Sequence, residues 1–425
     1  MDAPPTSLKR SLTLLGLVLY GLAYVAPITV LTTYGVATEA SGGRLALSYL
    51  IATLGIFLTA LSYGHLAAVF PQAGSVYAYA SRGLHPHVGF LAGWAIALDY
   101  LMIPALNFIV LGIFGSALVP AVPPWAWGLA ALALTTTLNL RGIETTDRAT
   151  RLVLGLELAV VAVFLLAALA KGEVAAPARP PLSAEALLAG AALVALSFLG
   201  FDAITTLSEE ARDPVRDVPR AVVLTCVFAG SLFVITAVLT FRAHPALRFA
   251  DPEAAGFAVA EALGGRTLAA LISVGQIVGS LASALAGQAG AARLLFGMSR
   301  DGGLPVAALG RLHPRRRTPD NATLLLAAIG TLGLMLPLGE AVSLVNFGAL
   351  LGFFLVNLSV IGHFVVRGGR RKPAELALYL VLPLLGAAVV AALFVGLSAR
   401  AKAIGAVWLA LGALRLLSRR GTRYS

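Results

Sequence analysis

The feature that most constrains this chain is a succession of apolar runs long enough to cross a lipid bilayer. Of its 425 residues, 59% are hydrophobic and 12% are charged, whereas a soluble domain carries about 25% charged residues. About 20 consecutive apolar residues span the hydrocarbon core. The runs predict about twelve transmembrane segments, near 11–37, 45–69, 88–119, 125–140, 149–170, 184–207, 219–241, 267–295, 320–337, 341–365, 375–395 and 401–417.

Two of these segments are interrupted near their middle. Tyr24-Val25-Ala26-Pro27 interrupts the first segment, and Leu199-Gly200-Phe201-Asp202 interrupts the sixth. Proline lacks a backbone N–H and glycine loosens a helix, so both positions expose peptide groups that lipid cannot satisfy. Irregular backbone at this depth lines a protein cavity, and paired interruptions at corresponding places are typical of a transporter's binding site.

The segments predict an all-α polytopic membrane protein with one transporter domain over residues 1–425. Five segments (11–170) precede five more (184–365), and an odd number reverses the orientation of the second block. We therefore expect a 5+5 inverted repeat with broken helices one and six. The last two segments (375–417) are expected to be peripheral helices, in a monomer or a homodimer.

The net charge of +11 is explained by orientation. When the segments alternate, most of the 31 lysine and arginine residues fall on the side that holds both termini. The positive-inside rule then places both termini in the cytoplasm of a multi-pass protein of the inner membrane. This distribution argues against a nucleic-acid surface. The single cysteine, Cys226, excludes an internal disulfide.

Three sequence motifs resemble those of a known family. They are Phe-Pro-Gln-Ala-Gly-Ser-Val-Tyr-Ala-Tyr-Ala at 70–80, the stretch 198–220 that contains Ser-Glu-Glu-Ala-Arg-Asp-Pro, and 291–305 with Phe-Gly-Met-Ser-Arg-Asp-Gly-Gly. In order and spacing they resemble the amino acid–polyamine–organocation (APC) permeases. Within that superfamily, residues 21–30, 86–90 and 98–100 most resemble the bacterial putrescine importers.

The resemblance implies a proton-coupled secondary transporter with substrate held between helices one, three, six and eight. The predicted substrate-binding residues are Tyr24, Val25, Ala26, Pro27, Asp99, Tyr100, Gly200, Phe201, Asp202 and Ser280. Amino acid members usually carry a glycine-rich break in helix one, whose amides take the substrate carboxylate. The first break here lacks that glycine cluster, and Pro27 has no amide hydrogen, which weakens a carboxylate site.

Acids inside a membrane are functional candidates, because a charge at the bilayer centre costs roughly 2.5–3.5 kcal/mol. Asp99 lies about ten residues into the third segment, near mid-membrane. We expect it to bind a substrate ammonium, and the alternative is a structural pair with a nearby hydroxyl or amide. Asp202 either caps the second half of helix six or contacts substrate. Phe201 is expected to act as an aromatic gate over bound substrate.

Proton coupling is assigned to Glu157, with Asp99 as a second candidate. By the resemblance, Glu157 occupies a place where several proton-coupled members carry a lysine. A carboxyl in apolar surroundings favours its neutral form, which suits a proton carrier. The alternative is an interfacial acid paired with Arg151. Sodium remains open as the coupling ion, with Ser280 or Ser283 as ligands.

Other polar residues are expected to be structural. Gln276, Ser280, Ser283 and Gly287 share one helical face, either a packing seam or a cavity wall. Glu209 and Glu210 are expected to form local ion pairs, and His65 and His363 to be packing residues. The run Arg315-Arg316-Arg317 is expected to be an inner-face anchor that meets anionic lipid.

The sequence therefore predicts a proton-coupled importer of a small organic cation, such as putrescine or a related polyamine. The alternative is a proton- or sodium-coupled amino acid permease of the same fold. We expect no cofactor and no bound metal. An enzyme is disfavoured because the sequence has no His-Glu-x-x-His pair, Gly-x-Ser-x-Gly elbow or phosphate-binding loop.

Overall fold

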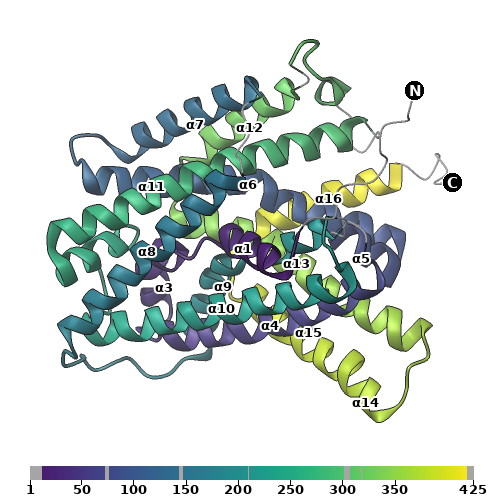
Figure 1. The fold of residues 1–425 in the computed structure, drawn as a ribbon, viewed down its shortest axis with the longest axis horizontal. Helices are drawn as coiled ribbons and strands as arrows, with labels where there is room; N and C mark the ends of the chain where they lie inside the picture. Colours follow the sequence, from purple (N-terminus) through teal and green to yellow (C-terminus); the bar gives the residue numbers. More distant parts are fainter. Residues whose placement is uncertain are drawn as a thin grey trace.

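The computed structural model describes residues 12–71, 76–142, 147–208, 210–300, 307–316 and 318–418. These residues form a bundle of helices (Figure 1). The first block comprises α1 (Leu14–Val25), α2 (Thr29–Thr32), α3 (Tyr34–Ala40), α4 (Leu45–Val69), α5 (Val76–Gly83), α6 (Pro86–Leu118), α7 (Pro124–Leu140) and α8 (Asp147–Lys171). The second comprises α9 (Ala184–Val194), η1 (Ala195–Phe198), η2 (Phe201–Leu207), α10 (Pro214–Ala243), α11 (Ala255–Arg300), η3 (Ala307–Gly310), α12 (Asp320–Gly333), α13 (Leu338–Val360) and η4 (Ile361–Arg367). The chain continues with α14 (Pro373–Leu376), η5 (Ala377–Val381), α15 (Leu382–Val395) and α16 (Ala399–Ser418).

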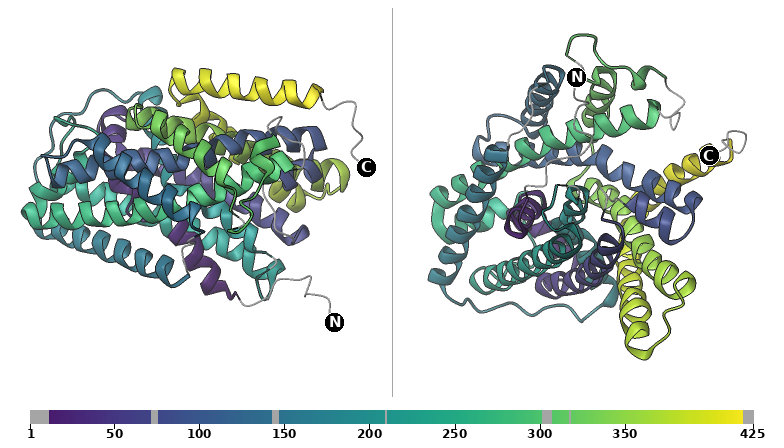
Figure 2. Two further views of the ribbon diagram at one scale, coloured as in Figure 1. Left: turned by 90° about the horizontal axis from the view of Figure 1, so that it is seen from above. Right: turned by 45° about the vertical axis from the view of Figure 1, so that its right-hand side comes forward.

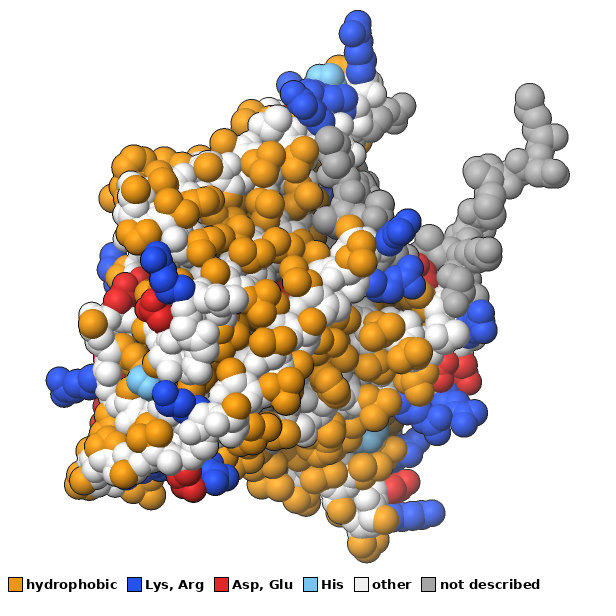
Figure 3. Space-filling model, turned by 60° about the vertical axis from the view of Figure 1, so that its left-hand side comes forward, with side chains coloured by type: hydrophobic (Ala, Val, Ile, Leu, Met, Phe, Trp, Pro, Cys, Tyr) orange, Lys and Arg blue, Asp and Glu red, His pale blue; other side chains and the backbone are white. Residues whose placement is uncertain are grey.

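Each of the twelve predicted segments coincides with helical structure. Within the described ranges, 9 helices are long and apolar enough to cross a membrane. The remaining three predicted segments correspond to α7, α12 and α16, which do not meet the combined criterion of length, hydropathy and few charged residues. Figure 3 shows one face of the molecule, where apolar side chains form a broad band and charged side chains gather toward its edges. The prediction of an all-α polytopic membrane protein is confirmed.

Both predicted helix breaks are confirmed. Helix α1 ends at Val25, and the next residue, Ala26, has φ 52°, in the left-handed region. Helical structure resumes only at Thr29. In the sixth segment, Leu199 is extended and Gly200 has φ 109°, after which η2 continues as a 3-10 helix. Helix α11 has a further interruption at Gly264 and Gly265, just before the predicted start of the eighth segment.

The two halves of the chain pack against each other through corresponding helices. The most extensive contacts in the bundle join α4 with α10 and α6 with α11. These are the second segment with the seventh and the third with the eighth, the pairs that an inverted repeat relates. Helix α1 lies inside the bundle, against α10, η2 and α8 (Figures 1 and 2). The division into two repeats, 11–170 and 184–365, remains a prediction that this packing favours.

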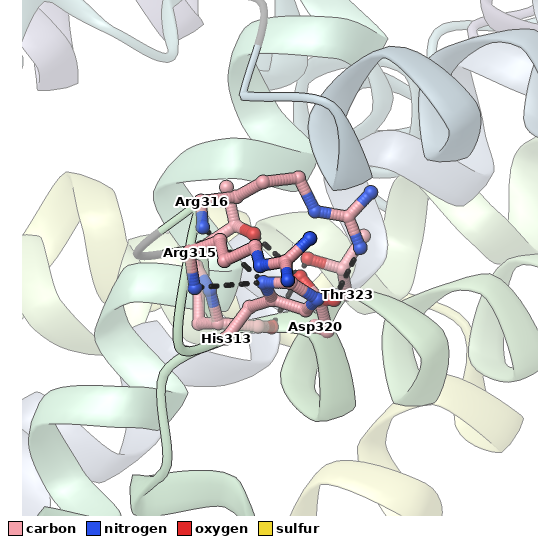
Figure 4. Close-up of polar contacts among 7 residues, drawn as sticks. His313, Arg315, Arg316, Asp320 and Thr323 are labelled. Atoms are coloured by element: carbon pink, nitrogen blue, oxygen red, sulfur yellow. Dashed lines mark hydrogen bonds and ion pairs between the residues drawn. The ribbon is translucent and has the colours of Figure 1, made fainter.

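We call the end of the bundle at which α1 begins the inner end, and the opposite end the outer end. The inner end carries a basic turn before α12 (Figure 4). His313 Nδ1 accepts the backbone N–H groups of Arg315 and Arg316, and the Arg316 guanidinium pairs with Asp320 at 3.0 Å. The Thr318 hydroxyl donates to the same carboxylate. Arg317 lies outside the described residues, and the predicted lipid contact of the arginine run remains a prediction.

Candidate functional site

The two helix breaks touch each other. A Cβ added to Gly200 would lie 3.0 Å from both the Cβ and the carbonyl carbon of Tyr24. One turn before Tyr24, a Cβ on Gly21 would lie 2.8 Å from Thr225 Oγ1 and would also overlap Ile204 of η2. Small residues on α1 and at the second break therefore bring the two discontinuous helices into backbone contact.

The first break presents hydrogen-bond acceptors. The Ala26 N–H donates to the Leu22 carbonyl at 3.1 Å, and Pro27 has no backbone N–H. The Thr29 hydroxyl donates to the carbonyl of Ala26 at 2.6 Å and to that of Val25 at 3.3 Å. The absence of a free amide at Ala26 and Pro27 disfavours a negatively charged group here, while the carbonyls of Val25 and Ala26 already accept hydrogen bonds from Thr29.

Two carboxylates lie beside these breaks. Asp99 of α6 is 7% exposed, and its Oδ1 has no hydrogen-bond partner among the described residues. It is close enough to Asp202 for the two charges to interact. The Tyr24 and Tyr100 side chains lie within electrostatic reach of both acids. The structure therefore brings together four of the predicted substrate-binding residues.

Asp202 also meets the start of its own half-helix. Its carboxylate interacts with the backbone N–H groups of Gly200, Asp202 and Ala203 and faces the Tyr63 hydroxyl. Asp202 is nevertheless only partly buried. Asp202 caps its half-helix and is also accessible beside Asp99. Capping and substrate contact, the two predicted roles of Asp202, are therefore compatible.

Phe201 packs away into an aromatic cluster. Its side chain is fully buried, and its ring lies edge-on to Tyr63 at 5.5 Å and tilted against Phe353 at 5.1 Å. In this conformation the ring is a wedge between η2, α4 and α13. The gate role remains a prediction that requires the ring to leave this cluster.

The polar face of α11 contacts α2 and α6. Gln276 donates to the Ile28 carbonyl at 3.3 Å and to the Thr32 hydroxyl at 3.0 Å, just beyond the first break. Ser283 accepts a hydrogen bond from Asn107 of α6. Ser280 is buried between these positions, but no hydrogen bond within the described part of the chain joins it to either break. Its substrate contact remains a prediction.

Glu157 lies apart from the Asp99–Asp202 pair, between α8 and α11. It is 2% exposed, and its Oε2 has no hydrogen-bond partner among the described residues. A Cβ on Gly279 would lie 2.5 Å from its Oε1, so the missing side chain of this glycine makes room for the carboxyl group. The Glu157 carboxyl group is thus enclosed between α8 and α11. The alternative pairing of Glu157 with Arg151 remains a prediction.

The remaining candidates are peripheral. His65 packs its ring against Tyr379 at 5.2 Å, and His363 packs against Phe70 at 5.0 Å. The Glu210 carbonyl accepts the Leu12 N–H, which ties the start of α1 to the segment after η2. Glu209 lies outside the described residues.

Sequence reasoning missed Tyr63 and Gly279. Tyr63 of α4 is fully buried, its hydroxyl has no hydrogen-bond partner among the described residues, and it faces Asp202. Gly279 contacts Glu157 only because two distant helices meet. The one sequence signal for Gly279 was its place beside Ser280 on a small-residue helix.

The two halves of the broken helices differ in exposure. Tyr24 is 39% exposed, and Thr206 of η2 is exposed as well. On the other side of the breaks, Val30, Leu31 and Tyr34 are almost fully buried. Residues on the inner side of the breaks are therefore accessible, whereas those on the outer side are packed.

Two neighbouring acids beside two touching helix discontinuities in a bundle of membrane-spanning helices are typical of a membrane carrier, and comparison with known proteins specifies which kind. Residues 16–412 match the family model of the amino acid permeases. The chain belongs to this family, within the APC superfamily, and is a transporter of the cell membrane, not an enzyme.

Curated relatives cover most of the chain. It is 37% identical over 421 residues to the low-affinity putrescine importer PlaP of Escherichia coli (96% of this chain, 93% of that protein). It is 28% identical to the branched-chain amino acid permease BcaP of Bacillus subtilis (84% and 81%). It is 29% identical to the methylthioribose transporter of Bacillus subtilis (84% and 81%). The family assignment made from sequence motifs is confirmed.

Proposed function

We propose that this protein is a proton-coupled importer of a small organic cation, putrescine or a related polyamine. The observation that carries the proposal is the pair of acids, Asp99 and Asp202, at the contact between the two helix breaks. The relative with 37% identity is named as a putrescine importer, which supports the same class of substrate.

The charge balance around the pair favours a cation. Residues 14–32, 88–118, 184–207 and 338–360 contain no lysine or arginine. Two carboxylates in such surroundings lack an internal counter-ion, and a membrane interior makes an unpaired charge costly. A substrate ammonium supplies the missing positive charge. Tyr24, Tyr63 and Tyr100 add aromatic surfaces, which attract cations.

The backbone at the breaks disfavours an amino acid carboxylate. At the first break, the Ala26 N–H is already bonded and Pro27 has none. At the second, the Asp202 carboxylate interacts with the amides of Gly200 and Ala203. A substrate carboxylate would therefore compete with a fixed carboxylate, whereas a diamine would not.

Asp99→Asn tests the proposal. The substitution removes the charge and keeps the shape of the side chain, so we expect the protein to fold and uptake of labelled putrescine into proteoliposomes to be lost. Asp217→Asn, in the first turn of α10, is the matched control and should transport normally. Undiminished putrescine uptake by Asp99→Asn would overturn the assignment of this site.

A substrate panel separates the two transport hypotheses. We expect diamines to raise the thermal midpoint of the purified protein and to support counterflow, and branched-chain amino acids to do neither. Counterflow also distinguishes a carrier from a channel, because only a carrier accelerates labelled uptake when unlabelled substrate is preloaded. Stabilisation and counterflow by a neutral amino acid alone would support the alternative of an amino acid permease.

For coupling we propose that Glu157 carries the proton. The Glu157 carboxyl is enclosed beside Gly279, and its Oε2 has no hydrogen-bond partner among the described residues. Both features suit a carboxyl that gains and loses a proton as α8 and α11 separate. Glu157→Gln should retain counterflow but lose uphill uptake driven by a proton gradient. If a sodium gradient alone drives uptake by the unmodified protein, this coupling proposal fails and the substrate site is unaffected.

The inner end is proposed to face the cytoplasm, because the basic loops lie there. Both termini would then be cytoplasmic. Thiol labelling of cysteines placed in the loops tests this orientation against a low background, since the natural Cys226 is buried.

A further inference from the structure

The Tyr63 side chain of α4 is held in one orientation by rings from three other segments. Its ring lies edge-on to Tyr79 of α5 at 5.8 Å, to Phe201 of η2 at 5.5 Å and to Phe353 of α13 at 6.1 Å. All four side chains are almost fully buried. Edge-on aromatic pairs have a preferred geometry, and a packed interior leaves a large ring little freedom to turn. The direction of the Tyr63 hydroxyl is therefore fixed by its surroundings.

The Tyr63 hydroxyl is a buried hydrogen-bonding group without a partner within the described ranges, although it faces the Asp202 carboxylate. Asp99 also lies within electrostatic reach of this hydroxyl, but it interacts more weakly than Asp202 does. A buried hydroxyl that makes no hydrogen bond is costly. Asp202 is only partly buried, and a small movement of its carboxylate toward Tyr63 would supply the partner.

Tyr49, on the same helix, shows how the fold satisfies a buried tyrosine. It is as deeply buried as Tyr63, and its ring packs against Phe233 at 5.5 Å. Its hydroxyl forms a hydrogen bond of 3.1 Å with the Ser197 hydroxyl. The hydroxyl of Tyr49 thus has a structural partner, whereas that of Tyr63 is directed at an acid of the proposed substrate site.

We propose that Tyr63 is a positioning residue, whose hydroxyl donates a hydrogen bond to the Asp202 carboxylate when an organic cation binds. This inference rests on the proposed function and adds a residue of α4 to its site. The hydroxyl occupies one carboxylate oxygen and leaves the other for the substrate ammonium. Because the Tyr63 ring cannot turn, the carboxylate is the group that moves. Tyr63 therefore fixes the direction in which Asp202 presents its charge.

Tyr63→Phe tests the role, because it removes the hydroxyl and keeps the ring with its three edge-on contacts. We expect the Michaelis constant for putrescine uptake into proteoliposomes to rise about tenfold, the effect of losing one hydrogen bond to a charged group. The maximal rate should change less than about twofold, because the bond forms on binding and is kept during transport. The thermal midpoint without substrate should not fall, because the fold loses no hydrogen bond.

Tyr49→Phe is the matched control. It removes the hydrogen bond with Ser197, so its thermal midpoint should fall, while its Michaelis constant should stay within about twofold of that of the unmodified protein. A purely structural role for the Tyr63 hydroxyl predicts the same pattern in Tyr63→Phe. The two substitutions have the same chemistry and should therefore separate affinity from stability.

Infrared difference spectra, recorded with and without putrescine, test whether the hydroxyl acts through the carboxylate. The substrate-induced shift of the carboxylate bands should be smaller in Tyr63→Phe and unchanged in Tyr49→Phe. An unchanged Michaelis constant in Tyr63→Phe would overturn this inference alone. A raised Michaelis constant with unchanged spectra would also overturn it, because the hydroxyl would then contact the substrate directly. If the unmodified protein neither binds nor transports putrescine, the proposed function fails and the inference fails with it.

Discussion

Replacing Gly200 with alanine tests whether contact between the two helix breaks is what builds the site. Gly200 has φ 109° and ψ −14°, a conformation that side chains rarely adopt. A residue forced into such a region costs about 1–3 kcal/mol. The new Cβ would also lie 3.0 Å from Tyr24 Cβ, and overpacking of this kind costs typically about 1–3 kcal/mol. The two effects together are at least about 2 kcal/mol.

The strain must be relieved at Tyr24 or at Asp202, because these residues flank the contact. Either movement displaces the substrate site. A share of about 1.4 kcal/mol of this strain in the transport step slows transport about tenfold. We therefore expect Gly200→Ala to transport putrescine at least about tenfold more slowly in proteoliposomes with matched protein content, and to have a lower thermal midpoint.

Gly155→Ala provides the control. Gly155 lies within α8, and nothing approaches the position of its missing Cβ within 4 Å, so alanine should be neutral or slightly stabilising. If Gly200→Ala transports within about twofold of the unmodified protein, at an unchanged thermal midpoint, the inferred contact does not shape the site.

Three further substitutions test individual contacts. Burial raises the pKa of the Glu253 carboxyl, which lies in the loop before α11. The folded protein therefore holds this proton more tightly than the unfolded chain does. The protonated carboxyl stabilises the fold below the ordinary glutamate pKa, and this stabilisation is lost as pH rises through the raised pKa. Thermal midpoints should therefore depend less on pH in Glu253→Gln, and an unchanged pH dependence would contradict this reasoning. Gly279→Ala places a Cβ 2.5 Å from Glu157 Oε1 and should cost about 1–3 kcal/mol, whereas Gly290→Ala, with open surroundings, should not. Asn357→Leu leaves the buried Ser62 hydroxyl of α4 without its acceptor and removes a donor to the Thr59 hydroxyl, which keeps its bond to the Gly55 carbonyl. The substitution should cost about 1–3 kcal/mol in thermal or denaturant unfolding, with substrate preference unchanged. A variant as stable as the natural protein would show that the Ser62 hydroxyl finds another partner.

The sequence predicted the helices and the breaks because both depend on local chemistry. Apolar length fixed α4 at 45–69, as observed. Pro27 and Gly200 indicated the breaks, because proline lacks a backbone N–H, glycine loosens a helix, and the two lie at corresponding places in the first and sixth segments. Asp99 and Asp202 were identified singly, from the cost of an acid in a membrane, and their proximity followed only from the family resemblance.

What the sequence could not predict depends on contacts between distant helices. Tyr63 is one tyrosine in a long apolar segment, and nothing in its neighbourhood distinguishes it from a packing residue. The Phe201 ring turned into a cluster with Tyr63 and Phe353, a choice set by space between helices and not by its own sequence. The sequence identified Glu157 as an acid inside a membrane segment, but its contact with Gly279 depends on the packing of α8 against α11.

The contacts at the outer end indicate what must break for the site to open there. The Glu39 carboxylate, at the end of α3, accepts the Phe249 N–H at 2.8 Å, and Glu253 accepts the Leu338 N–H at 2.7 Å. Together they fasten the loop 244–254 over the outer halves of the bundle, whereas Tyr24 and Thr206 remain exposed toward the inner end. If the two blocks form an inverted repeat, the outer half of helix one corresponds to the inner half of helix six. Opening the outer end then requires release of these two carboxylate contacts and burial of η2. The energy of this conformational change is therefore concentrated in the loop and the two broken helices, and the rest of the bundle can stay in place.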